Sequence, residues 1–364
     1  MNDFAINLKP RSSAPAKKKK AGPPPKIARW LFVCAASVFI MALIGAITRL
    51  TESGLSIVEW KPITGALPPL NPAQWDLEFG LYKKSPQFLK VNSGMTLAEF
   101  KHIFFWEWLH RLWGRVIVGI IYAVPLCWYW ARGKIPGEAK PGFLFILCLG
   151  FAQGLMGWLM VRSGLNDQPA VSHYLLAAHL MLAFLIYASM FRLGLAFGIE
   201  PERDAGKLTR LRGWVQLTLL LAVTTMTWGA FVAGLRAGLL YNDSFPLMGK
   251  YLWPVEGFTV QPPWLAFFAE PATVQFTHRV LAITTFCAIL TLGARARAFH
   301  PPPRLQRVFT ALVVMAFLQV GLGISTLISH VNIILATAHQ AGALTVLTLL
   351  VWLLHEIPHI PQEK

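Results

Sequence analysis

Charged residues are scarce in this sequence. Asp, Glu, Lys and Arg make up 14% of its 364 residues, whereas hydrophobic residues make up 55%. A soluble globular chain normally carries about 25% charged residues. The deficit excludes an ordinary soluble domain, because so few charges cannot cover the surface of a protein of this length. Much of the chain is therefore expected to be surrounded by lipid rather than by water.

Cysteine is also scarce, and its positions exclude two kinds of chemistry. All four cysteines lie inside apolar runs, and no pair has the C-x-x-C spacing of a metal or redox site. A disulfide framework or a zinc site is therefore not expected. We interpret these cysteines as small apolar helix residues: Cys34, Cys127, Cys148 and Cys287.

Acidic residues are half as frequent as basic ones, with 17 Asp and Glu against 33 Lys and Arg, which gives a formal net charge of +16. The basic residues flank long apolar runs and do not form one patch. This distribution argues against nucleic-acid binding and favours a role in setting membrane topology.

Eight apolar stretches are long enough, or nearly so, to cross a hydrocarbon core that needs ~20 helical residues. Helices are expected because lipid leaves the edges of an open sheet without hydrogen-bond partners. The predicted fold class is an all-α, polytopic membrane protein with eight transmembrane helices. The predicted spans are 30–48, 104–131, 142–161, 172–194, 213–234, 272–294, 308–328 and 333–355.

The basic residues predict the orientation of these helices. They gather in residues 1–29 and in the connections 132–140, 203–212 and 295–307. By the positive-inside rule these segments are cytoplasmic, so both termini lie inside and the longest loop, from residue 51 to about 101, lies outside. Residues 1–29 are too rich in lysine and proline to fold, and we expect a disordered cytoplasmic tail.

The two halves of the chain resemble each other at four places. Gly45 to Gly54 resembles Gly229 to Gly238, and Glu107-Trp-Leu-His110-Arg111 resembles Gln275-Phe-Thr-His278-Arg279. Gln153 to Gly157 resembles Gln319 to Gly323, and Ala177-Ala-His179 resembles Thr337-Ala-His339. Because each half has four helices, both insert in the same direction. We therefore expect two pseudo-symmetric four-helix bundles, residues 30–197 and 213–355.

Four of the ten histidines occupy these matched positions: His110, His179, His278 and His339. Each is expected about six to eight residues from the outer end of its helix, ~10 Å below the surface. Two imidazoles at one depth on two helices of a bundle can hold a haem iron. Hydrogen bonding between helices is the alternative. Four matched histidines favour iron ligands, because ionisable groups in lipid are costly and usually functional.

Glu107 precedes His110 by three residues, so the two share a helix face. Gln275 has the matching position in the second half. A carboxylate in an apolar setting can exchange protons near neutral pH. Alternatively, Glu107 pairs with Arg111 or Arg115 as an ordinary interfacial salt bridge. The difference between the halves favours chemistry in the first bundle and a permanent cofactor in the second.

Arg111 and Arg279 each follow a candidate iron ligand. A guanidinium there can bind haem propionates in bidentate fashion, or it can extend to lipid headgroups. The glycines near Gln153 and Gln319 are expected to let helices pack closely. These are Gly154, Gly157, Gly321 and Gly323.

Two segments carry a specific resemblance: Thr48-Arg-Leu-Thr-Glu-Ser-Gly-Leu-Ser56 through Pro68-Pro69, and Phe100 to Gly114. They resemble the first outer loop and second helix of the haem A synthase family, and the likeness extends over roughly residues 28–355. It implies oxidation of the C8 methyl of haem O to a formyl group, with oxygen from water, to give haem A for cytochrome oxidase.

The resemblance also assigns roles. His278 and His339, with Arg279, would bind a resident haem b. His110 and His179, with Arg111, would bind the substrate haem, and Glu107 would assist its oxidation. The upstream partner would be haem O synthase, the protohaem farnesyltransferase.

Residues 50–103 contain no cysteine, so the chain resembles the cysteine-free branch of alphaproteobacteria and mitochondria. We expect the bacterial inner membrane. A second hypothesis is a di-haem b-type cytochrome that takes electrons from quinol; it explains the histidine pairs but not the difference between Glu107 and Gln275. A transporter with parallel repeats is a third, although the charges near the midplane that it would need are not evident. Whether the chain forms a homo-oligomer stays open.

Overall fold

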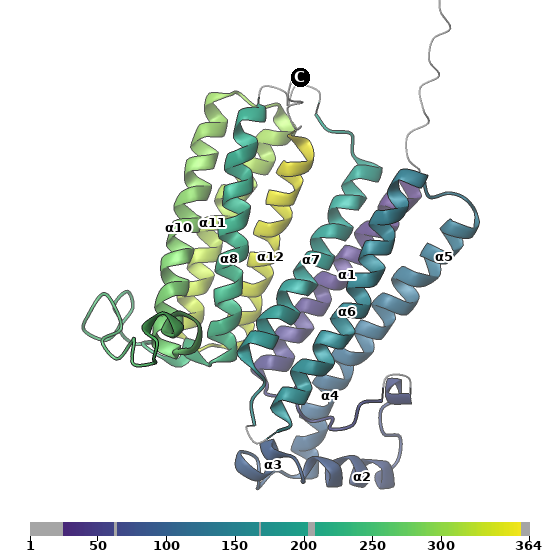
Figure 1. Cartoon of the computed structure of the whole chain (residues 1–364), viewed down its shortest axis with the longest axis vertical. Coiled ribbons are helices and arrows are strands. Elements are labelled where there is room, and N and C mark those ends of the chain that lie inside the picture. Colours follow the sequence, from purple (N-terminus) through teal and green to yellow (C-terminus); the bar gives the residue numbers. More distant parts are fainter. Residues whose placement is uncertain (1–24, 62–63, 167–168, 203–207, 358–364) are drawn as a thin grey trace, which may run out of the picture.

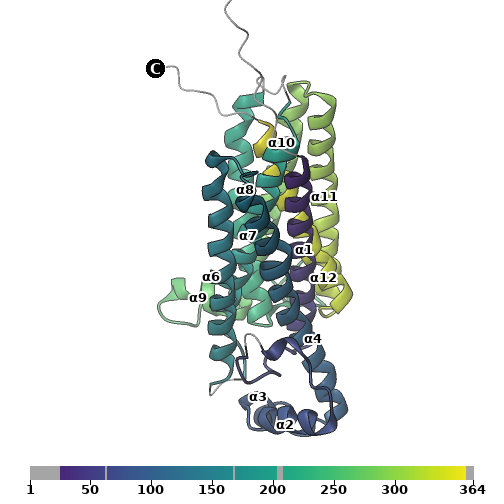
Figure 2. The same ribbon diagram turned by 90° about the vertical axis from the view of Figure 1, so that its right-hand side faces the viewer.

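Long helices that run side by side make up most of the molecule (Figures 1 and 2). The computed structural model describes residues 25–61, 64–166, 169–202 and 208–357. Within these ranges there is no β-strand, and eight helices are long and apolar enough to cross a membrane. All eight predicted spans and the all-α class are therefore confirmed.

The eight spans are formed by nine helical elements, because α4 and α5 are joined by a π-helical segment, Val116–Ala123. In chain order the elements are α1 (Pro25–Leu50), α4 (Leu97–Arg115) with α5 (Val124–Ala131), α6 (Lys140–Gly164), α7 (His173–Gly198), α8 (Arg212–Gly234), α10 (Pro271–Ala298), α11 (Pro303–Ile328) and α12 (Ile333–Glu356). At ~1.5 Å per residue each of the eight spans, with α4, the π-helical segment and α5 counted as one, is longer than the ~30 Å hydrocarbon core.

The two ends of the molecule differ. Three short helices lie at one end, which we call the loop end: α2 (Pro72–Tyr82), α3 (Pro86–Lys90) and α9 (Ala266–Ala269) (Figure 1). The described chain begins and ends at the opposite, terminal end. Most of the predicted tail, residues 1–29, lies outside the described residues, and its last five residues are already part of α1.

The helices pack as two groups. One hydrophobic cluster joins α1, α5, α6 and α7, and another joins α8, α10, α11 and α12. Figure 1 shows the same two groups side by side. Helix α12 contacts the first group as well: Gln340 Nε2 donates to Ala42 O of α1 at 2.6 Å, and the hydroxyls of Tyr187 and Thr348 are 2.6 Å apart. Leu344 and Leu347 of α12 belong to the first cluster.

Helix α4 begins seven residues before the predicted span, at Leu97. Thr96 and Glu99 form a capping box, in which each side chain bonds the backbone N–H of the other residue, and this arrangement starts a helix. The extra turns are stabilised by an aromatic cluster with α2 that includes Tyr82 and Phe100, both fully buried. His110 therefore lies thirteen residues from the start of its helix, not six to eight, and α4 projects beyond the other spans (Figure 1).

A buried carboxylate fixes the second long loop, between α8 and α10. Glu270, which is 7% exposed, accepts hydrogen bonds from Phe258 N, from Thr259 N and Oγ1, and from Thr273 Oγ1. Burial raises the pKa of this carboxyl, but the hydrogen bonds outweigh burial, so the pKa lies below its ordinary value. The charged form is the one that these four donors stabilise.

We predict that the loop around Phe258 loosens in acid. A carboxyl whose pKa is depressed in the folded protein stabilises it above the unfolded pKa of about 4.3, and this contribution is lost as pH falls through the folded pKa. The protection factors of residues 256–270, which compare hydrogen exchange with the intrinsic rate at each pH, should therefore fall as the pH drops from about 5 through the folded pKa.

In Glu270→Gln, the amides of residues 256–270 should exchange faster already at the higher pH, and their protection should lose most of its dependence on pH. Glu200→Gln, which changes an exposed glutamate at the terminal end, is the control and should behave like the unmodified protein. An unchanged exchange rate in Glu270→Gln would contradict this role.

Candidate functional site

His110 of α4 and His179 of α7 face each other near the loop end. Their ring centroids are 6.5 Å apart, with the rings inclined at 42°. Two imidazole–metal bonds of about 2.0–2.1 Å each would place the centroids of two opposed rings ~6 Å apart. One iron between them therefore fits this separation. Neither Nδ1 atom has a hydrogen-bond partner among the described residues.

His278 of α10 and His339 of α12 form the second pair, and the two imidazoles are close enough to interact electrostatically. His278 Nδ1 lies 3.1 Å from Thr225 O. A carbonyl oxygen can only accept, so Nδ1 must carry the proton and Nε2 keeps a free lone pair. This is how a backbone carbonyl sets the tautomer of a metal-ligating histidine.

In each pair, one histidine is contacted by a glutamine of a neighbouring helix. Gln153 Nε2 donates to His179 O at 3.1 Å and lies 3.2 Å from His179 Nε2. Gln319 Nε2 donates to His339 O at 3.0 Å. The structure thus brings the four predicted histidines together in two pairs. In each pair, a glutamine of the third helix of the group binds the histidine of the fourth helix.

Glu107 lies beside the first pair, and its carboxylate is buried, with 3% of the residue exposed. Oε2 accepts from Ser56 Oγ at 2.7 Å and from Ile57 N at 2.8 Å. Oε1 accepts from Arg111 Nη2 at 2.5 Å. The ion pair considered from the sequence is therefore present with Arg111, but it is buried and it also holds the loop that follows α1. Arg115 donates instead to Lys61 O and Gly65 O.

Gln275 has the same place beside the second pair, and it is also 3% exposed. Its Nε2 donates to Ala237 O at 2.8 Å and to Leu240 O at 2.7 Å. Leu240 follows Gly229 by eleven residues, as Ser56 follows Gly45. Both residues therefore attach the loop after the first helix of their group. They differ in charge: one position offers a carboxylate, the other a neutral amide.

The two arginines that follow the histidines also bind these loops. Arg111 donates through Nη2 to Ile57 O at 3.0 Å, in addition to its ion pair. Arg279 Nη1 donates to Leu247 O at 3.1 Å, whereas its Nη2 is buried and has no partner in the part of the chain that is described. Arg279 thus retains a donor for an anionic group, while Arg111 is engaged by Glu107 and its loop.

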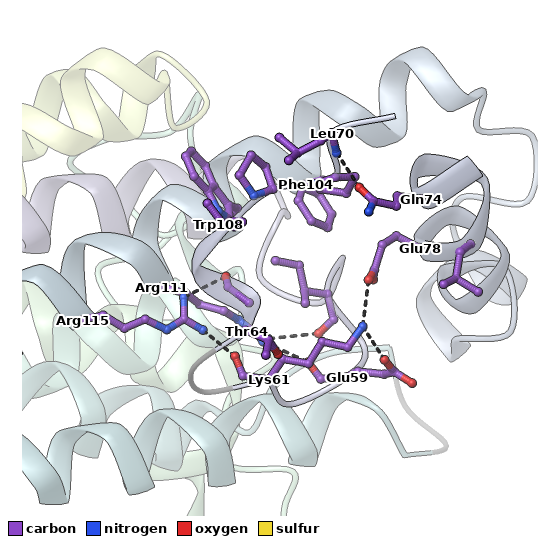
Figure 3. Close-up of a pocket in the computed structure, with 16 residues that line it drawn as sticks. Glu59, Lys61, Thr64, Leu70, Gln74, Glu78, Phe104, Trp108, Arg111 and Arg115 are labelled. Atoms are coloured by element: carbon purple, nitrogen blue, oxygen red, sulfur yellow. Dashed lines mark hydrogen bonds and ion pairs between the residues drawn. The ribbon is translucent and has the colours of Figure 1, made fainter. Parts of the chain in front are cut away.

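A cavity of about 410 Å³ opens on the outer side of Arg111, between residues 57–70, α2 and α4 (Figure 3). Lys61 crosses one wall, where Nζ lies 2.6 Å from Glu59 and 3.0 Å from Glu78. Hydrogen bonds with Glu59 and then Glu78 raise the pKa of Lys61. This cavity was not expected from the sequence. Its signal is the spacing of Phe104, Trp108, Arg111 and Arg115, which places one face of α4 along it.

The fold and the site define a class: a helical membrane protein with two pairs of facing histidines near one end of its helices. Its sequence matches the family described as "Cytochrome oxidase assembly protein" over residues 28–351. It is 49% identical to the "Heme A synthase" of Rhodospirillum centenum, over 97% of this chain and 94% of that protein.

Two further relatives agree. The "Heme A synthase" of Agrobacterium fabrum is 45% identical over 87% of this chain and 86% of that protein. The human "Heme A synthase COX15" is 41% identical over 92% of this chain and 83% of that protein. The chain belongs to the haem A synthase family.

We predict that Gln275→Leu destabilises the protein without changing any histidine. The substitution removes the side-chain donor to Leu240 O and one of the two donors to Ala237 O, which keeps Leu240 N at 3.1 Å. A buried group left unsatisfied costs about 1–3 kcal/mol. The melting temperature in detergent should fall by several degrees. Gln306→Leu, at an exposed position of α11, is the control; equal melting temperatures for the two variants would contradict the prediction.

Proposed function

We propose that this protein is a haem A synthase, an oxidoreductase that converts the C8 methyl group of haem O to a formyl group. The observation that carries the proposal is the asymmetry of two otherwise similar histidine pairs. A buried carboxylate, Glu107, lies beside the first pair, and a buried amide, Gln275, lies beside the second. Relatives that share 41–49% of their residues over most of the chain are named heme A synthases.

The first pair, His110 and His179, would bind the iron of the substrate haem. Oxidation of a methyl group with water as the oxygen source gives a formyl group, four protons and four electrons. A base next to the substrate must therefore take up protons. Glu107 suits this role because its helix also carries His110, one turn further along, and because a positioned carboxylate can exchange protons repeatedly.

Arg111 and the loop hold Glu107 in place for this reaction. Ser56, Ile57 and Arg111 donate to both carboxylate oxygens, so the side chain has one orientation. Arg111, which binds Glu107, lines the cavity at the loop end, and this cavity would connect the Arg111 side of the site to solvent. Protons taken up by Glu107 would leave the site toward the loop end.

The second pair, His278 and His339, would hold the resident haem b, which supplies one-electron transfer when bound. Thr225 fixes the tautomer of His278, and an oriented imidazole binds metal more tightly. Arg279 would bind a propionate through its free Nη2. Among the described residues, His339 Nδ1 and both Nδ1 atoms of the first pair lack such a partner. The first pair thus has no imidazole oriented in this way, as would suit a haem that must leave as product.

We also propose that the two groups of helices, residues 30–197 and 213–355, are duplicated bundles. Glu52 and Arg236 each follow the matched glycine by seven residues, and both have a positive φ, 55° and 52°. Their side chains pair with each other at 2.8 Å. A contact between equivalent positions is expected at an axis that relates two repeats.

The location follows from the same family and from charge. The basic segments lie toward the terminal end, so that end would face the cytoplasm of a bacterium and the loop end would lie outside the inner membrane. Haem O would come from haem O synthase, the farnesyltransferase that makes it.

We predict that Glu107→Gln retains haem but loses haem A formation. The amide cannot accept a proton, and positioned acid–base groups typically contribute about 10²–10⁴-fold in rate. Cells that also express haem O synthase should accumulate haem O, which extraction and mass analysis would detect.

Ser56→Ala is the control for this variant. It weakens the attachment of the loop but keeps the carboxylate, so it should still form haem A. Normal product from Glu107→Gln would exclude Glu107 from the reaction.

We further predict that the purified protein, expressed with haem O synthase, contains two kinds of haem. Haem b should occur together with haem O or haem A, as shown by pyridine haemochrome spectra and mass analysis. Haem b alone at both sites would indicate the b-type electron-transfer cytochrome instead. Protein without haem would contradict both functions and leave the transporter.

A further inference from the structure

Each of the four paired histidines lies directly against a glycine of another helix. A Cβ atom added to Gly45 would lie 2.9 Å from His110 Cε1, and one added to Gly229 would lie 3.1 Å from His278 Cε1. The same contact recurs at Gly157, where the distance to His179 Cε1 is 3.1 Å, and at Gly323, where the distance to His339 Cε1 is 2.9 Å.

The four contacts share one geometry. In every case the Cε1 atom is the closest part of the ring, and Nδ1 follows at 3.4–3.6 Å. Within each group the glycine of the first helix faces the histidine of the second, and the glycine of the third helix faces the histidine of the fourth. The glycines therefore contact the imidazoles along the edge that joins the two ring nitrogens.

The spacing of glycines along a helix does not by itself explain these four contacts. The sequence led us to expect that Gly154 and Gly321 also serve close packing, but a Cβ at either would meet nothing within 4 Å. That expectation is wrong, because both residues face away from the neighbouring helices. On α11 only Gly323, opposite His339, lacks space for a side chain; on α6 Gly157 lacks it opposite His179, and Gly164, at the end of the helix, lacks it against Leu55.

We propose that Gly45, Gly157, Gly229 and Gly323 are positioning residues that orient the haem-ligating imidazoles. A ring fixed to its helix at Cβ and to iron at Nε2 cannot turn away from a new methyl group. Alanine must then displace the ring from the iron or separate the two helices. This inference rests on the haem binding of the proposed function and adds four residues to it.

The test compares neighbouring glycines of one helix in the full-length protein, expressed with haem O synthase. Gly323→Ala should lower the affinity for haem b about tenfold, the lower end of the loss seen when the outer partners of a metal-ligating histidine are changed. Its remaining haem should show a weaker low-spin electron paramagnetic resonance signal. Gly321→Ala, two residues away, should keep the haem content and the spectrum of the unmodified protein.

The first pair is tested in the same way. Gly157→Ala should lose haem O and haem A but retain haem b, and Gly154→Ala should retain all of them. Equal haem content and equal spectra for Gly323→Ala and Gly321→Ala would overturn the inference. Unmodified protein that binds no haem would overturn the proposed function as well, so the two failures are distinguishable.

A double variant covers the case in which Gly323→Ala does not fold. Removal of the ring in His339→Ala removes the atom that the new methyl would meet. Gly323→Ala combined with His339→Ala should therefore melt within about 1 °C of His339→Ala alone, because a contact that is already absent adds nothing in a double-mutant cycle. Further destabilisation in the double variant would show that Gly323 serves helix packing instead, and would overturn the inference.

Discussion

Lipid offers no hydrogen bonds, so every polar group within the eight spans depends on a partner in the chain itself. Most find one. Trp30 Nε1 donates to Ile121 O at 2.7 Å, in the π-helical segment where the regular hydrogen-bond pattern changes. Gln340 uses Ala42 O. Among the described residues, many of the exceptions lie near the site, including Nδ1 of three of the four paired histidines and Nη2 of Arg279, whereas Arg212 Nε and Arg304 Nε lie at the terminal end. Buried polar groups left open in this way indicate a ligand.

The lack of hydrogen-bond partners in lipid also bears on the residues beside the histidine pairs, which hold the loops at the helix ends. Glu107 and Gln275 both satisfy backbone groups of the loop after the first helix of their group. One position therefore has a structural role in both halves, and the first half places a charge there. Under the proposed function, that charge would add chemistry to a residue that the fold needs in any case. A change at Glu107 would then affect the loop as well as the proposed reaction, which is why Ser56 is the more informative comparison.

The sequence predicted the eight spans because apolar length is a local property that hydropathy reports directly. It also predicted which histidines pair, since matched positions in two halves place them at similar depths. It did not predict the early start of α4, although Thr96 and Glu99 carried that signal. The attachment of Ser56 to Glu107 was not predictable, because the two residues are far apart in the chain and the path of the loop decides their contact. The packing of Gly157 against His179 was likewise hidden, since spacing within a helix does not say what a neighbouring helix presents.

The contact of α12 with α1 bears on how the two histidine pairs are separated. His339 is followed immediately by Gln340, whose amide reaches Ala42. Less than one turn beyond Ala42, Gly45 lies against His110. A short path of covalent bonds, one hydrogen bond and one van der Waals contact thus leads from one imidazole to the other. This path runs entirely through the chain, so under the proposed function the electronic coupling along it would be set by the fold.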